Sequence, residues 1–187
     1  MRDTPIVKLA IREVSTYCDF ADLAYRSLDK SGSQEAVRCF FYAHSFLVHC
    51  ATVARLLRSS DLAEHAGGRT IAELLELPRD YRIENESVRE VIDSYDTRLA
   101  HGLSLRGEVG KILDFNIGDR DAFEEEYSLF LRHYDPTVDT LTLMEEEFNL
   151  AQIAAELADI KSRADDWLER NASLGERPAT VSIPPRY

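Results

Sequence analysis

Ionisable side chains gather on one predicted helix of the chain, at spacings that place several of them on a common face. Arg89, Asp93 and Asp96 step by four and then three positions, and Arg98 and His101 are three apart. Arginine holds phosphate or carboxylate through its planar fork, and histidine transfers protons near neutral pH. The spacing allows a site with an arginine-bound anion, a proton-transferring histidine and orienting aspartates. The structural alternative is an Arg89–Asp93 pair and a solvated histidine at the helix end.

The helix that carries these groups is predicted over about residues 87–102. Its apolar side chains recur at helical spacing and form a stripe facing the core, made of Val88, Val91, Ile92, Tyr95 and Leu99. Gly102 follows the last of them, where helices commonly end.

Three more long apolar stripes predict helices over about residues 5–28, 33–59 and 149–170. The second is the most apolar, so we expect it at the centre, with either Phe40 or Phe41 pointing inward. The sequence therefore predicts an all-α domain over residues 1–171, a four-helix bundle with a small accessory β element. Residues 172–187, with three prolines and little periodicity, are expected to form a flexible tail.

The segment between the third and fourth stripes is harder to interpret. Residues 111–117 and 140–144 have short apolar runs that favour strands, and a small hairpin would use both. Residues 122–133 are compatible with a helical turn or two. Before the third stripe, residues 70–75 predict a short helix that Pro78 ends.

Composition narrows the function classes. The chain has 187 residues, 44% of them hydrophobic, a formal net charge of −12 and a pI near 4.9. This charge disfavours broad binding to DNA, RNA or anionic membranes. We expect no membrane span, no secretory signal and a cytoplasmic location. The odd number of cysteines, Cys18, Cys39 and Cys50, within apolar patterns predicts buried free thiols.

Other candidate sites have weaker geometry. His44 and His49 are five positions apart, about 140° around a helix, which does not suit one metal ion. His44 is interpreted as a hydrogen-bonded core histidine. The acidic runs 124–126 and 145–147 are interpreted as solvated faces. The sequence therefore predicts no metal site and no cofactor.

The segment Arg89-Glu90-Val91-Ile92-Asp93-Ser94-Tyr95-Asp96-Thr97-Arg98-Leu99 resembles a motif of the HEPN superfamily. Its members are compact helical bundles, usually dimeric, with an arginine followed four to six residues later by histidine. One group reads Arg-Asn-x-x-Glu-His-Tyr-Asp-Glu-Arg-Leu, and Arg89, Tyr95, Asp96, Arg98 and Leu99 match it. The strand predicted over 140–144 before the last helix is also similar to that group.

The chain departs from the motif at its catalytic position, because Ser94 stands where the histidine would be. Catalytic members cut RNA in a cleft that two subunits share, and other members serve as binding or dimerisation modules. The missing histidine and the acidity favour the second kind. The resemblance thus implies a homodimeric binding or regulatory module, with a nucleotide, RNA or another anion as ligand.

The ligand would be held by Arg89, Ser94, Tyr95, Asp96 and Arg98. The first alternative is a metal-independent ribonuclease with a rearranged site formed by Arg89, Arg98 and His101. The second alternative is a structural subunit of a larger complex, in which the polar helix face is an interface.

Overall fold

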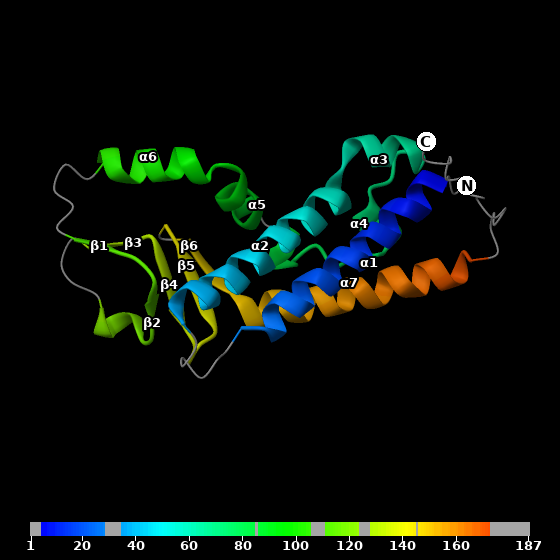
Figure 1. Ribbon diagram of the computed structural model, residues 1–187. Helices are drawn as coiled ribbons and strands as arrows, with labels where there is room; N and C mark the ends of the chain where they lie inside the picture. The colour runs from blue at the N-terminus through cyan, green and yellow to red at the C-terminus, as the bar shows by residue number, and fades with distance from the viewer. Residues whose placement is uncertain are drawn as a thin grey trace, which may run out of the picture.

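The computed structural model describes residues 5–28, 35–84, 86–105, 111–123, 128–144 and 146–172. Three long helices run side by side: α1 (Pro5–Arg26), α2 (Ala36–Arg58) and α7 (Leu150–Arg170). Figure 1 shows the strands gathered at one end of this layer, away from residue 172. The described part of the predicted tail is Ala172, and residues 173–187 lie outside the described residues.

The three long helices bury the stripes that the periodicity predicted. α1 packs on both α2 and α7. Phe46 and Leu47 of α2 are fully buried, as are Ile11 of α1 and Ile160 of α7. Phe40 is buried and Phe41 is exposed, which decides between the two candidates for the inward side chain. α2 packs on α1, α4 and α5, but α1 is the helix that lies between the other two long helices, so the prediction that α2 is at the centre is wrong.

Two of the predicted helices begin at a capping residue. The Thr70 hydroxyl accepts from the Glu73 N–H at 3.2 Å, and the Glu73 carboxylate accepts from the Thr70 N–H at 2.8 Å, at the start of α4 (Ile71–Leu74). Asn149 accepts from the Gln152 N–H at 2.8 Å and begins α7. The sequence did not predict the short helix α3 (Ser60–His65) or the 3₁₀ turn η1 (Arg82–Glu84).

The single helix predicted over residues 87–102 is two helices, α5 (Glu86–Asp93) and α6 (Tyr95–Leu105). Val88 and Val91 of α5 are buried against the bundle, whereas Leu99 of α6 is half-buried. Figure 1 shows α6 beyond the end of α5, over the strands. The part of the chain that the structure describes is mostly helical, with a small β region, and is not a regular four-helix bundle.

The β region holds six strands in the described residues. β2 (Asn116–Ile117), β4 (Arg132–Asp135), β5 (Thr140–Leu143) and β6 (Glu146–Asn149) form a four-stranded sheet in that order. β2 is parallel to β4, and the other pairs are antiparallel. β1 (Lys111–Leu113) and β3 (Ser128–Phe130) form a second, parallel pair. The 3₁₀ turn η2 (Arg120–Ala122) lies between β2 and β3.

Two predictions for this region are wrong. Where helical turns were predicted over 122–133, the structure has strand β3 and the start of strand β4. The strand was not predicted because Leu129 and Phe130 are both buried, on opposite faces, so the sequence lacks the alternation of apolar and polar residues that indicates a strand. The strand predicted over 140–144 is confirmed as β5, but it pairs with β4 and β6, and not with 111–117. The predicted strand over 111–117 is interrupted at Phe115, whose φ of 56° is left-handed.

The most apolar helix also has the length and composition of a membrane span. α2 is the one such helix in the described residues, and half of its most apolar 18-residue stretch is buried inside the protein. The side chains Cys18, Cys39 and Cys50 are free and buried. The prediction of buried free thiols is therefore confirmed.

Candidate functional site

Ser94 separates the two halves of the predicted polar site. Its hydroxyl donates to the Glu90 carbonyl at 2.5 Å, and the same carbonyl accepts the Ser94 N–H at 2.9 Å. Serine that bonds back to the preceding turn competes with the helical ladder and often bends a helix. Ser94 lies at the junction of α5 and α6.

Arg98 is occupied by the protein's own carboxylates. Its Nη1 donates to Glu146 Oε1 at 3.0 Å, its Nη2 to Glu90 Oε2 at 3.3 Å and its Nε to the Ser94 hydroxyl at 3.3 Å. An external anion at this guanidinium has to displace two carboxylates. Arg89 is half-buried on α5 and makes no hydrogen bond or ion pair within the described residues.

The aspartates of the predicted site do not converge on the arginines. Asp93 pairs with Arg55 of α2, and not with Arg89, so the intrahelical pair of the structural interpretation is absent. Asp96 is exposed on α6. The backbone of His101 lies in α6, and its side chain lies outside the described residues. Asp93 thus pairs outside the predicted site, whereas Arg98 and Ser94 are in contact.

Tyr95 faces a group that the sequence did not connect with it. Its ring lies edge-on to His44, 6.5 Å between centroids. Arg132 of β4 makes two hydrogen bonds to Asp114, at 2.7 and 2.6 Å, and its guanidinium lies 4.4 Å from the Phe115 ring. Partial desolvation, and to a smaller extent the positive charge of Arg132, lower the pKa of His44. His44 is exposed, so its assignment as a core histidine is wrong.

A second polar cluster is buried on the sheet face that points away from the helices. His133 of β4 is 1% exposed, and both of its ring nitrogens lack a hydrogen-bond partner. The rings of Phe123 and Phe130 lie edge-on to it, with centroids 5.7 and 5.0 Å away. Its register partners are Asn116, whose buried Nδ2 also lacks a partner, and Thr142. Unpaired buried polar atoms cost stability.

Burial is the largest cause that lowers the pKa of His133. The Arg120 charge lowers it further, whereas Asp135, Asp119 and Glu147 raise it. Arg120 itself pairs with Glu147 and lies 5.1 Å from the Phe130 ring centroid. His133 is therefore neutral in the folded protein near neutral pH.

We expect acid to destabilise the protein through His133. Its pKa is lower in the folded than in the unfolded chain, so the contribution of neutral His133 to stability is fully present above about pH 6.5 and is lost as the pH falls below that value, down to the lower pKa of the folded state. The loss in unfolding free energy between pH 7.5 and 5.5, measured by urea denaturation, should be smaller in His133→Gln than in wild type. The variant of exposed His65, His65→Gln, is the matched control and should follow wild type. Equal losses in all three proteins would contradict this assignment.

The sequence analysis missed Arg55, Glu146, Arg132 and Asp114 as partners of the site. Each lies far along the chain from the side chain that it contacts, 48 residues for Glu146 and Arg98. Helical spacing reports only neighbours three or four residues apart, so no signal on 87–102 points to them. Within the described residues, no group of three or more His, Cys, Asp or Glu side chains is arranged to hold a metal ion.

No family model, no curated protein and no solved structure matches this chain.

Proposed function

We propose that this protein is a HEPN-like helical module that acts by binding and does not cleave RNA. The resemblance at residues 89–99 supplies the class, and the mostly helical structure is compatible with it. The observation that carries the non-catalytic part is the state of Arg98, held by Glu90 and Glu146 beside a serine.

A ribonuclease of this kind needs a proton-transferring group close to the arginine. Ser94 stands at that position, and its hydroxyl is already bonded to the Glu90 carbonyl. A serine hydroxyl does not exchange protons near neutral pH as an imidazole does. The ribonuclease alternative therefore depends on His101, and the described residues supply no contact that brings it to Arg89.

The protein binds an anion in this proposal, and Arg89 is the cationic side chain that holds it. Arg98 is neutralised by two carboxylates, whereas Arg89 keeps its charge without a carboxylate partner among the described residues. Arginine at such a position binds phosphate or carboxylate through paired N–H groups. A nucleotide phosphate is the anion that the family resemblance favours.

We expect no RNA cleavage above background by the purified protein. General acid–base help is worth roughly 10²–10⁴ in rate, so a site without its histidine should leave little turnover. The measurement is hydrolysis of a labelled RNA by wild type, Arg89→Ala and His101→Ala. Robust cleavage by wild type that either variant abolishes would establish the ribonuclease. Thermal stabilisation by nucleotides, absent in Arg89→Ala, would support anion binding.

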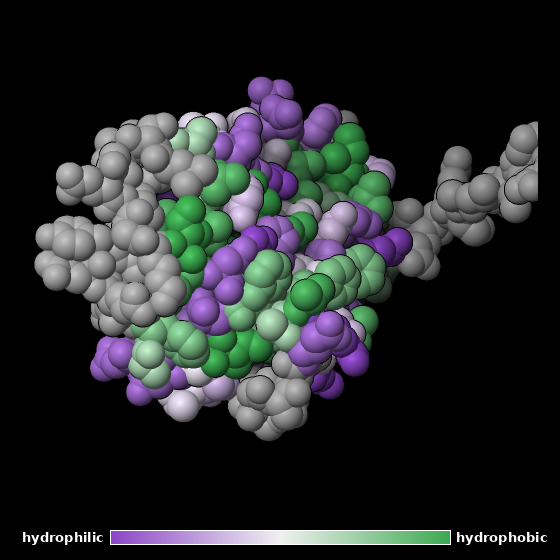
Figure 2. Space-filling view, turned by 60° about the vertical axis from the view of Figure 1, so that its left-hand side comes forward, coloured by the Kyte–Doolittle hydropathy of each residue, from purple (hydrophilic) through white to green (hydrophobic). Residues whose placement is uncertain are grey.

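The partner that we propose is a second copy of this chain. Apolar side chains are exposed on both helices of the α1–α2 pair: Phe20 and Leu23 on α1, and Val37 and Phe41 on α2. Figure 2 shows apolar residues, in green, exposed between hydrophilic residues, in purple. Two-fold pairing is the commonest assembly of soluble chains, and it buries the same apolar surface on both copies.

We expect Phe41→Glu to convert a dimer to a monomer. Phe41 is 63% exposed, so a charge there opposes association while leaving the core intact. Light scattering at micromolar concentration gives the mass of wild type, Phe41→Glu and the control Val138→Glu, which alters an exposed apolar residue of the β4–β5 loop. A monomeric wild type would exclude the dimer.

A further inference from the structure

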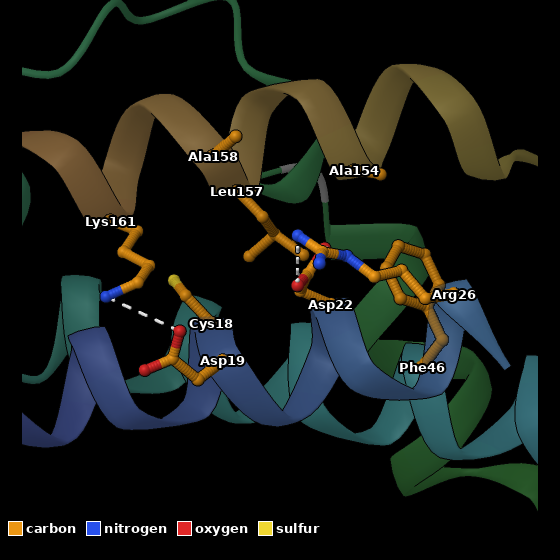
Figure 3. Close-up of a pocket in the computed structure, with 9 residues that line it drawn as sticks. All are labelled: Cys18, Asp19, Asp22, Arg26, Phe46, Ala154, Leu157, Ala158 and Lys161. Atoms are coloured by element: carbon orange, nitrogen blue, oxygen red, sulfur yellow. Dashed lines mark hydrogen bonds and ion pairs between the residues drawn. The ribbon is translucent and has the colours of Figure 1, made fainter.

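A pocket of about 210 Å³ opens between α1 and α7, with α2 behind it. Its inner wall is apolar: Phe46 is fully buried, and Leu157 and Cys18 are 3% and 2% exposed. Figure 3 shows the side chains of Cys18 and Leu157 pointing into the space between the two helices. Burial raises the pKa of the Cys18 thiol to about 12, so the thiol is neutral and belongs to the apolar wall.

Charged groups flank this apolar wall on both sides. Lys161 lies opposite Asp19 at one side, and Arg26 pairs with Asp22 at the other (Figure 3). Asp19 and Asp22 are three residues apart on α1, so their carboxylates share one face. An apolar space with a charged rim suits a small amphipathic molecule.

The cationic groups of the rim are already satisfied. Lys161 Nζ donates to Asp165 at 2.8 Å and to the Ser15 hydroxyl at 3.2 Å, and its pair with Asp19 is the longest contact at 3.4 Å. The Asp165 hydrogen bond is the largest cause that raises the pKa of Lys161, which stays charged. Losing Asp19 thus leaves the lysine with its two closer partners.

The balance of charge decides which end group the pocket accepts. Among the lining residues, Asp19 and Asp22 balance Lys161 and Arg26, and Asp165, which does not line the pocket, pairs with Lys161 and leaves one carboxylate in excess. The chain as a whole carries a net charge of −12. Asp19 is the most exposed carboxylate of the group, at 59%. An incoming ammonium therefore finds an accessible acceptor, whereas a carboxylate is repelled.

We propose that the α1–α7 pocket binds a small primary amine with a compact apolar body. The ammonium lies between Asp19 and Asp22, and the apolar body lies against Leu157, Phe46 and Cys18. An apolar cavity of about 150 Å³ is known to hold benzene, so one ring with a short aminomethyl arm fits. This site is separate from the α5–α6 residues and does not depend on the proposed function.

The test uses benzylamine as the probe on the full chain. Ala158 is an exposed residue that lines the pocket, so Ala158→Phe fills the opening without altering the core. Ala155 is exposed on the same helix outside the pocket lining, and Ala155→Phe is the matched control. Titration calorimetry should show saturable binding to wild type and Ala155→Phe, and none to Ala158→Phe.

The charge of the ligand is tested separately. Asp19→Asn should weaken benzylamine binding about two- to fivefold, the range of an exposed ion pair, and benzyl alcohol should be weaker than benzylamine by a similar factor. Benzoate should bind least. No saturable benzylamine binding, equal binding to the two phenylalanine variants, or tighter binding of benzoate would each overturn the proposal.

Discussion

Phe40→Ala should lower the free energy of unfolding by about 3–5 kcal/mol, because the side chain is buried and the truncation leaves a cavity. Phe40 is 4% exposed at the start of α2, and its ring lies edge-on to Phe115 at 5.5 Å. It therefore joins α2 to the β1–β2 connection. Urea denaturation followed by circular dichroism gives the change.

The next residue is the internal control for that prediction. Phe41 is 63% exposed and contacts Tyr42 of the same helix. Phe41→Ala removes as many atoms from the same helix and, measured at protein concentrations at which the chain is monomeric, should change the unfolding free energy by no more than about 0.5 kcal/mol. Equal losses in the two variants would mean that the orientation of α2 in the bundle is wrong.

Asp139→Ala should have the second large effect and lower the free energy of unfolding by about 3–5 kcal/mol, because two tyrosine hydroxyl groups lose the buried carboxylate that accepts their hydrogen bonds. Asp139 is 8% exposed. It accepts from the Tyr25 hydroxyl at 2.5 Å and from the Tyr134 hydroxyl at 2.7 Å. Its backbone carbonyl accepts the Leu150 N–H at 2.9 Å, so one residue holds α1, β4 and the start of α7.

Two further variants separate the causes of that loss. Asp139 has a φ of 52°, a left-handed conformation that asparagine also tolerates and alanine does not. Asp139→Asn keeps one acceptor oxygen and the backbone preference, so it should cost less than Asp139→Ala. Tyr25→Phe removes one hydroxyl and should cost about 1–2 kcal/mol. A loss below 1 kcal/mol for Asp139→Ala would contradict the bridging role.

The sequence by itself determined the elements whose signal is local. Apolar side chains at helical spacing specify α1, α2 and α7, because one stripe per helix has to be buried. Thr70 with Glu73, and Asn149 with Gln152, satisfy the free N–H groups at helix starts within one turn. The burial of the three cysteines follows from their place in these stripes.

The tertiary structure decided what depends on partners far along the chain. The spacing of Arg89 and Asp93 allowed an ion pair within one helix, but Asp93 forms its ion pair with Arg55 of α2. In the same way, Arg98 forms an ion pair with Glu146, so of the two arginines of the predicted anion site Arg98 has a carboxylate partner and Arg89 has none among the described residues.

The strand pairings were also decided by the tertiary structure. Leu129 and Phe130 are buried on opposite faces, so the sequence of β3 does not alternate between apolar and polar residues. β5 pairs with β4 and β6. The α1–α7 pocket depends on how two helices 124 or more residues apart in sequence pack, which no local pattern encodes. The periodicity of the sequence indicates which face of a helix is buried, and only the tertiary packing determines which other elements that face contacts.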